Sequence, residues 1–140
     1  MSEAGASGRG PAVDASANLL RFITTPSFWV SAAQRPSSAA IDKPKFSVNI
    51  ESLASFAEHQ RQLTDVLKRP TGGIVRFACS AARALSFQAH AEIDDEYPEN
   101  VAHAHVYDDG EDRTRKKRAR SLASQCDVIV EPRFNELLSE

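Results

Sequence analysis

Two runs of alternating apolar and polar residues lie close together in the second half of the chain and constrain its fold more than any other feature. Apolar side chains occupy every second position from Phe87 to Ile93, and again from Ala102 to Val106. A period of two is typical of a strand with one buried face. The acidic stretch 94–100 separates the runs, and Pro98 within it cannot occupy a central strand position. The sequence therefore predicts a β-hairpin whose strands are joined by an acidic loop.

Helical periodicity occurs in two other segments. Apolar residues recur every three or four positions from Leu53 to Leu67, after Asn49, which suits a helix N-cap, and before Pro70, which ends a helix. Helical spacing resumes over 113–125. Further short strands are expected at 43–49, 74–77 and 127–130, with a short helix at 80–85 and extended pieces between 18 and 41. This order predicts an α+β fold with a small mixed or antiparallel sheet and two main helices.

Residues 1–17 contain mainly Gly, Ser, Ala and Pro and almost no large apolar side chain, so the sequence predicts a disordered N-terminal tail there. Residues 18–140 then form a single α+β domain. No stretch approaches the roughly 18 apolar residues that a membrane span requires, and no signal-peptide pattern is present. Cys79 and Cys126 lack metal-site or redox spacing and are expected to be free thiols. These observations favour a cytoplasmic protein without membrane partners.

Two histidines on the second predicted strand are the main candidates for chemistry. His103 and His105 are two positions apart, so they project from the same face of a strand and could flank a substrate, with Glu99 of the loop as a carboxylate partner. Two imidazoles could also share a metal, but a third ligand is usually needed and the sequence identifies none; His90 on the neighbouring strand could supply it if the hairpin register places it opposite. A strand face with solvated or hydrogen-bonded histidines is the alternative. Neither a metal nor a cofactor is expected.

A strong charge asymmetry marks the segment that follows. Nine acidic residues between Glu92 and Asp112 are followed by six cations between Arg113 and Arg120. The candidate nucleic-acid contacts in this basic helix are Arg115, Lys116, Lys117 and Arg118. Alternatively, the preceding acids neutralise the cluster through pairs spaced four residues apart.

Two polar residues elsewhere are further candidates for binding. Arg76 lies in a predicted core strand, where an arginine normally points outward or pairs with an acid, and it could line an anion or nucleotide pocket. Asn100 follows Pro98 at a spacing that favours a turn in which the side chain bonds its own backbone.

Residues 73–106 resemble a group of small stand-alone bacterial proteins to which no activity is assigned. The shared elements are Ile74-Val-Arg-Phe77, Ala82-Arg-Ala-Leu85 and the segment Glu96-Tyr-Pro-Glu-Asn-Val-Ala-His-Ala-His-Val106. Val101 and Ser86 replace a proline and a glycine that are usual in this group. The resemblance implies a bacterial origin and singles out Pro98, Asn100, His103 and Ala104.

Three functions are compatible with these observations. The first is an accessory or interaction module of a bacterial gene cluster, with a protein partner at the hairpin and the basic helix. The second is a minimal hydrolase or nuclease that uses His103 with a nearby carboxylate. The third is nucleic-acid binding through Arg113 to Arg120. No complete catalytic set can be assembled from the sequence, so it leaves open whether the chain is an enzyme.

Overall fold

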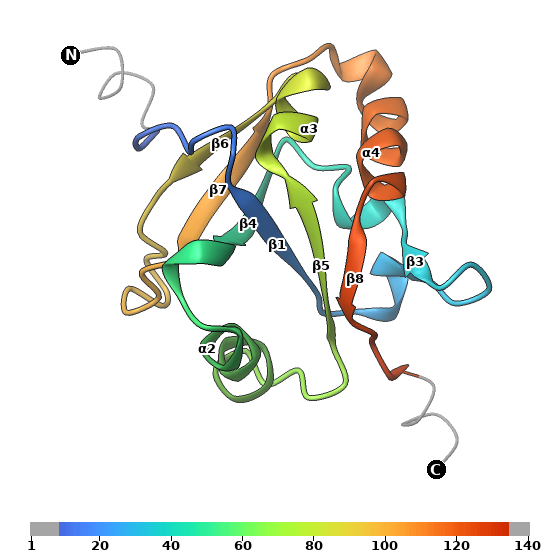
Figure 1. Ribbon diagram of the computed structural model, residues 1–140. Helices are drawn as coiled ribbons and strands as arrows, with labels where there is room; N and C mark the ends of the chain where they lie inside the picture. The colour runs from blue at the N-terminus through green and yellow to red at the C-terminus, as the bar shows by residue number, and fades with distance from the viewer. Residues whose placement is uncertain (1–8, 135–140) are drawn as a thin grey trace.

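A six-stranded sheet forms the centre of the structure, a computed structural model that describes residues 9–134 (Figure 1). Its strands, in spatial order, are β6 (Phe87–Ala91), β7 (His103–Asp108), β4 (Lys45–Ile50), β1 (Asn18–Ile23), β5 (Gly73–Ala78) and β8 (Asp127–Val130). A separate ribbon pairs β2 (Trp29–Val30) with β3 (Arg35–Pro36). The predicted α+β class is confirmed, and every strand pairing is antiparallel.

The predicted hairpin is confirmed as β6 and β7. Ala89 lies opposite Val106 and His90 lies opposite His105. The alternation places Ala104 and Val106 on a fully buried face, so His103 and His105 lie on the opposite face.

Two helices cover the buried face of the sheet. α3 (Cys79–Ala84) and α4 (Arg115–Ser124) pack there through Ala82, Ala119 and Leu122. The 3-10 turn Ser38–Ala40 completes this layer with the buried Ala40 and the following Ile41. Figure 1 shows α3 and α4 together at one end of the molecule, away from α2.

The opposite face is partly covered by α2 (Phe56–Arg61), which continues as a π-helical turn (Gln62–Val66). Leu63 of this turn packs against Leu20 of β1 and Ile74 of β5. This smaller cluster covers the β1–β5 side, whereas the β6–β7 side of the same face carries the histidines.

The predicted start of the long helix was wrong. Asn49 lies inside β4, a 3-10 turn (Glu51–Leu53) follows, and the N-cap of α2 is Ser55. The Ser55 hydroxyl accepts from the Glu58 N–H, and the Glu58 carboxylate accepts from the Ser55 N–H. This reciprocal capping box satisfies two N–H groups at the start of α2.

The predicted buried stripe of this helix was wrong at its first residues and right at Leu63. Leu53 and Phe56 are each 50% exposed, whereas Leu63 is buried as expected, and His59 and Gln62 are buried as well. Because the helix begins after Ser55 and widens into a π-helical turn, the buried face falls on different residues from those of a regular helix that starts at Asn49.

The predicted disordered tail differs from the structure at residues 9–17. Val13 is buried and its N–H donates to the Ala89 carbonyl, while the Ala91 N–H donates to the Pro11 carbonyl. Residues 9–13, here called the strap, therefore cover the outer edge of β6. A single apolar anchor and backbone pairing order this segment despite its composition. The remainder of the predicted tail, residues 1–8, and the end of the predicted domain, residues 135–140, lie outside the described residues.

No helix within residues 9–134 combines the length and the apolarity needed to cross a membrane. Cys79 is buried and Cys126 is half-buried, and both are free thiols, as expected.

Candidate functional site

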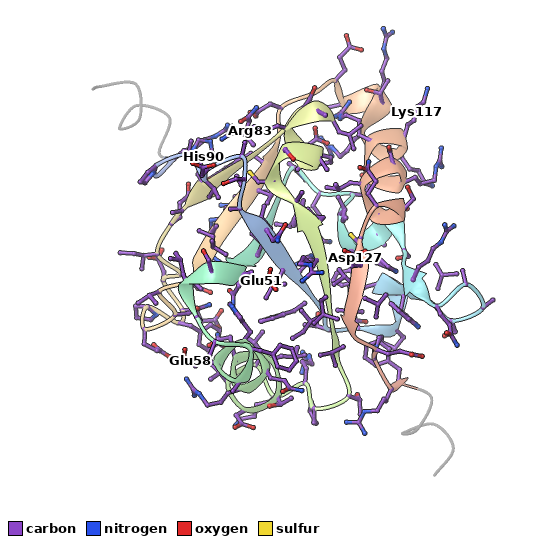
Figure 2. All side chains as sticks on the ribbon, in the orientation of Figure 1. Glu51, Glu58, Arg83, His90, Lys117 and Asp127 are labelled. Carbon is purple, nitrogen blue, oxygen red and sulfur yellow. The ribbon has the colours of Figure 1, made fainter. Side chains whose placement is uncertain are left out.

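Three histidines and a tyrosine share the polar face of the β6–β7 hairpin. The rings of His103 and His105 meet edge to face with centroids 4.7 Å apart, and Tyr107 follows on the same face. His90 lies opposite His105 and packs against Tyr107. Figure 2 shows His90 on β6, at the strap end of the sheet. The predicted clustering of the two histidines is therefore present.

Glu92, directly after β6, is the centre of a hydrogen-bond network on this face. Its Oε1 accepts from His105 Nδ1 at 2.6 Å, and the Tyr107 hydroxyl lies 2.7–2.8 Å from both carboxylate oxygens. The Gly10 N–H donates to Oε2 at 3.0 Å. Burial raises the pKa of Glu92, but these hydrogen bonds lower it by more, so the pKa lies below its usual value.

The same network affects Tyr107. Burial, followed by the hydrogen bond to the Glu92 carboxylate, raises the pKa of Tyr107 to about 12. The tyrosine therefore stays protonated and continues to donate to Glu92 up to strongly alkaline pH.

The hydrogen bond from His105 to Glu92 determines which nitrogen of the neutral imidazole carries the proton. Because Nδ1 donates to a carboxylate, Nε2 carries the free lone pair of the neutral ring. The side chain is 20% exposed and lines a groove of about 690 Å³ together with Lys45, Ile93 and Asp95. His105 is thus a base positioned by a carboxylate and reachable from the groove, which is the arrangement that general base catalysis requires.

The strap holds this network in place. The Arg9 guanidinium lies 4.0 Å from the Tyr107 ring centroid and pairs with Asp109 at 2.8 Å. The Gly10 carbonyl accepts from His90 Nδ1 at 2.8 Å. A Cβ at Gly10 would lie 1.9 Å from the Ala91 carbonyl oxygen, so only glycine allows the strap to approach β6 this closely.

His103 has a different environment. It is 5% exposed, and its Nδ1 donates to the Glu92 carbonyl at 2.8 Å. Its Nε2 lies 3.8 Å from Asp94 Oδ2 and has no hydrogen-bond partner within residues 9–134. Both residues line a cavity of about 210 Å³ between the π-helical turn and the β6–β7 loop, here called the His103 cavity.

Asn100 belongs to a chain of hydrogen bonds that supports the loop. Its Nδ2 donates to Asn49 Oδ1 at 3.0 Å, and its Oδ1 accepts from the Ala102 N–H. Asn49 Nδ2 donates in turn to Nδ1 of the buried His59, whose Nε2 donates to the Glu51 carbonyl. Asn100 therefore bonds its own backbone, as predicted, and also connects the loop to β4 and α2.

Two other predicted site residues, Glu99 and Arg76, do not contact the histidines. Glu99 is exposed on the loop, and the carboxylates that face the histidines are those of Glu92 and Asp94. Arg76 pairs with Glu51 at 3.3 Å and with Asp127 at 3.6 Å across the sheet. Figure 2 shows Glu51 and Asp127 in the middle of the molecule, away from His90.

The acidic neighbours neutralise half of the predicted basic site. Arg118 pairs with the fully buried carboxylate of Asp108 at 2.7 Å, and Arg115 lies 3.7 Å from the same carboxylate. Lys116 and Lys117 are exposed, and Figure 2 shows Lys117 at the outer end of the α4 region.

No group of three or more His, Cys, Asp or Glu residues among residues 9–134 is arranged to hold a metal ion. No protein-family model, curated protein or solved structure matches this chain.

Proposed function

We propose that the chain is a minimal hydrolase in which His105, and not His103, is the general base. The observation that carries the proposal is the 2.6 Å bond from His105 Nδ1 to Glu92 Oε1, which leaves Nε2 as the free acceptor of a side chain that lines the groove. His103 is less suited to this role because it is 5% exposed and because its Nδ1 donates to a backbone carbonyl instead of a carboxylate.

In the proposed reaction, Nε2 of His105 takes a proton from a water molecule while the water oxygen attacks an electrophilic carbonyl or phosphoryl centre in the groove. The imidazolium that forms is stabilised by the Glu92 carboxylate, and it then returns the proton to the leaving group. Tyr107 and the Gly10 N–H hold Glu92 in position. Lys45 also lines the groove, and its positive charge would stabilise the negative charge that develops on the substrate.

The experiment is an assay of the full chain with a carboxyl ester, p-nitrophenyl acetate, and a phosphodiester, bis-p-nitrophenyl phosphate. General acid–base catalysis contributes about 100- to 10,000-fold, so we expect His105→Gln to reduce the rate by that range. Glu92→Gln should reduce it by at least about tenfold, because the imidazolium loses its countercharge. The matched control is Glu99→Gln, which changes an exposed loop carboxylate that does not face the histidines. Turnover that is equal in wild type and His105→Gln would contradict the proposal.

A specific observation also favours the interaction-module function. Ile93 and Val101, on the β6–β7 loop, are 74% and 76% exposed, and they line a shallow hollow with Pro11 and Pro98. Apolar side chains gathered in this way are typical of a protein contact. Affinity capture from the native bacterial host should then recover a specific partner with wild type and lose it with Val101→Asp. Retention of that partner by the variant would exclude this surface.

Nucleic-acid binding remains a proposal that depends on Lys116 and Lys117, because Arg115 and Arg118 are already paired with Asp108. If it is right, retention on DNA or RNA should weaken with salt and disappear in the double variant Lys116→Glu/Lys117→Glu. Binding that is insensitive to those changes would contradict it.

A further inference from the structure

We propose that the His103 cavity binds a small organic molecule with a primary ammonium group. The cavity is distinct from the His105 groove, and the proposal does not depend on hydrolysis. Its polar wall contains His103 and Asp94, and its apolar wall contains Leu20, Phe22 and Leu67.

Two acceptor atoms face each other at the polar wall. His103 Nδ1 donates to the Glu92 carbonyl, so Nε2 of the neutral ring is an acceptor. Asp94 Oδ1 accepts from the Glu96 N–H at 3.0 Å, and its Oδ2 lies 3.8 Å from that Nε2. This separation is too long for a hydrogen bond, and two acceptors repel unless a donor lies between them. An ammonium group has three N–H donors, so it can bond to Asp94 Oδ2 and, once a small shift of the ring uncovers the buried Nε2, to Nε2 as well.

The charge of the lining favours a cation. Asp94 and Glu96 bring two carboxylates to the cavity. Arg21 is the cationic residue of this lining, but its guanidinium donates to the carbonyls of Ala40 and Ser47. Because hydrogen bonds to carbonyls leave the guanidinium charged, the lining has two carboxylates against one cation, and this net negative charge attracts a positively charged ligand.

The size and the apolar wall define the rest of the ligand. A dry apolar cavity of about 150 Å³ accommodates benzene. The His103 cavity has a volume of about 210 Å³, so it has room for one ring or a short alkyl chain in addition to the ammonium group. Leu20, Phe22 and Leu67 provide the apolar surface for that body. The ligand class is thus an alkyl or arylalkyl primary amine.

The test is a calorimetric and NMR titration of the full chain at neutral pH with three matched probes: 2-phenylethylamine, 2-phenylethanol and phenylacetate. We expect saturable binding of the amine, at least about tenfold tighter than the alcohol, and no binding of the anion. Amide shifts should centre on Asn49, Asp94 and Asn100. Asp94→Asn should weaken amine binding by about tenfold or more. Asp95→Asn removes the neighbouring carboxylate, which lines the His105 groove, and should leave binding unchanged.

Three results would overturn the proposal: no saturable binding of the amine, equal affinity for amine and alcohol, or equal weakening by Asp94→Asn and Asp95→Asn. A doubly protonated His103 ring without any amine, detected by 15N NMR, would also overturn it, because the imidazolium would then satisfy Asp94. Amine binding is measured without turnover and should persist in His105→Gln. The failure of this site and the failure of the proposed hydrolase are therefore distinguishable.

Discussion

Individual polar residues beneath the β6–β7 loop can be buried at low cost because they form hydrogen bonds with one another. Asn49 is the central residue, since its amide donates to His59 and accepts from Asn100. Asn49→Ala would leave both partners unpaired, and a buried polar group without a partner costs about 1–3 kcal/mol. We therefore expect the free energy of unfolding, measured in urea, to fall by about 2–4 kcal/mol.

The control for Asn49→Ala is Gln60→Ala, which removes an exposed amide from the adjacent helix. Its effect should stay within about 0.5 kcal/mol. If Asn49→Ala were as mild as the control, the chain of hydrogen bonds from α2 to the loop would not contribute to stability.

The raised pKa of Tyr107 predicts that the free energy of unfolding falls at alkaline pH. Its pKa in the folded state is about 12, which lies above the ordinary value near 10. Because the folded-state pKa is raised, the contribution of Tyr107 is fully present below pH 10 and is lost as the pH rises from 10 to 12. Urea titrations at pH 9, 10 and 11 should show a steeper decline for wild type than for Tyr107→Phe. The control Tyr97→Phe should decline as wild type does, and parallel curves for wild type and Tyr107→Phe would contradict this account.

At the scale of elements, the start of α2 can be tested directly. The hydroxyl of Ser55 is one half of the capping box, so Ser55→Ala leaves an N-terminal N–H without its acceptor. Loss of such a cap costs about 1 kcal/mol of unfolding free energy. The matched control is Ser52→Ala, an exposed serine in the preceding 3-10 turn, which should change stability by less than about 0.5 kcal/mol. Equal effects of the two substitutions would mean that the capping box does not define the helix start.

The elements that could be predicted from the sequence are those with a local signal. Period-two alternation located β6 and β7, and a short β-prone run bounded by Pro132 located β8. The beginning of α2 was missed because Asn49 and Ser55 are both good N-caps, and local preference alone does not choose between them. Pairing of β4 with β7 makes that choice, since it places Asn49 opposite His103 inside the sheet.

The candidate site was predictable only in part, because some of its contacts follow from local spacing and others depend on how the strands pair. His103 and His105 share a strand, so their common face follows from spacing alone. Glu92 falls on the same alternating positions of its strand as His90, but its bond to His105 depends on the hairpin register. The contribution of Gly10 had no sequence signal, because the strap is ordered by backbone hydrogen bonds to a strand about 80 residues away in sequence.

At the scale of the whole molecule, the sheet joins two layers with different roles. One face carries the apolar core beneath α3 and α4, and the other carries the small cluster beneath α2 beside the histidine face. The two sheet edges also differ, because the strap pairs with β6 whereas β8 pairs with β5 alone among the described strands. The histidine face is therefore supported from behind by the main core and fixed at its edge by the strap.

Asp108 connects the end of the hairpin to the helical layer, so it should influence the stability of the whole domain. Its fully buried carboxylate accepts from Arg118 at 2.7 Å and from the Gly110 N–H at 3.0 Å. Breaking a buried ion pair by removing one partner costs about 3–5 kcal/mol, because the remaining charge stays buried. We expect Asp108→Asn to reduce the free energy of unfolding by that amount in a urea titration. The control is Asp112→Asn, whose carboxylate pairs with Arg115 but is 89% exposed, so the loss should be at most about 1 kcal/mol. Similar losses from the two substitutions would show that the basic helix is held by its apolar contacts, and that Arg118 is available for an external ligand.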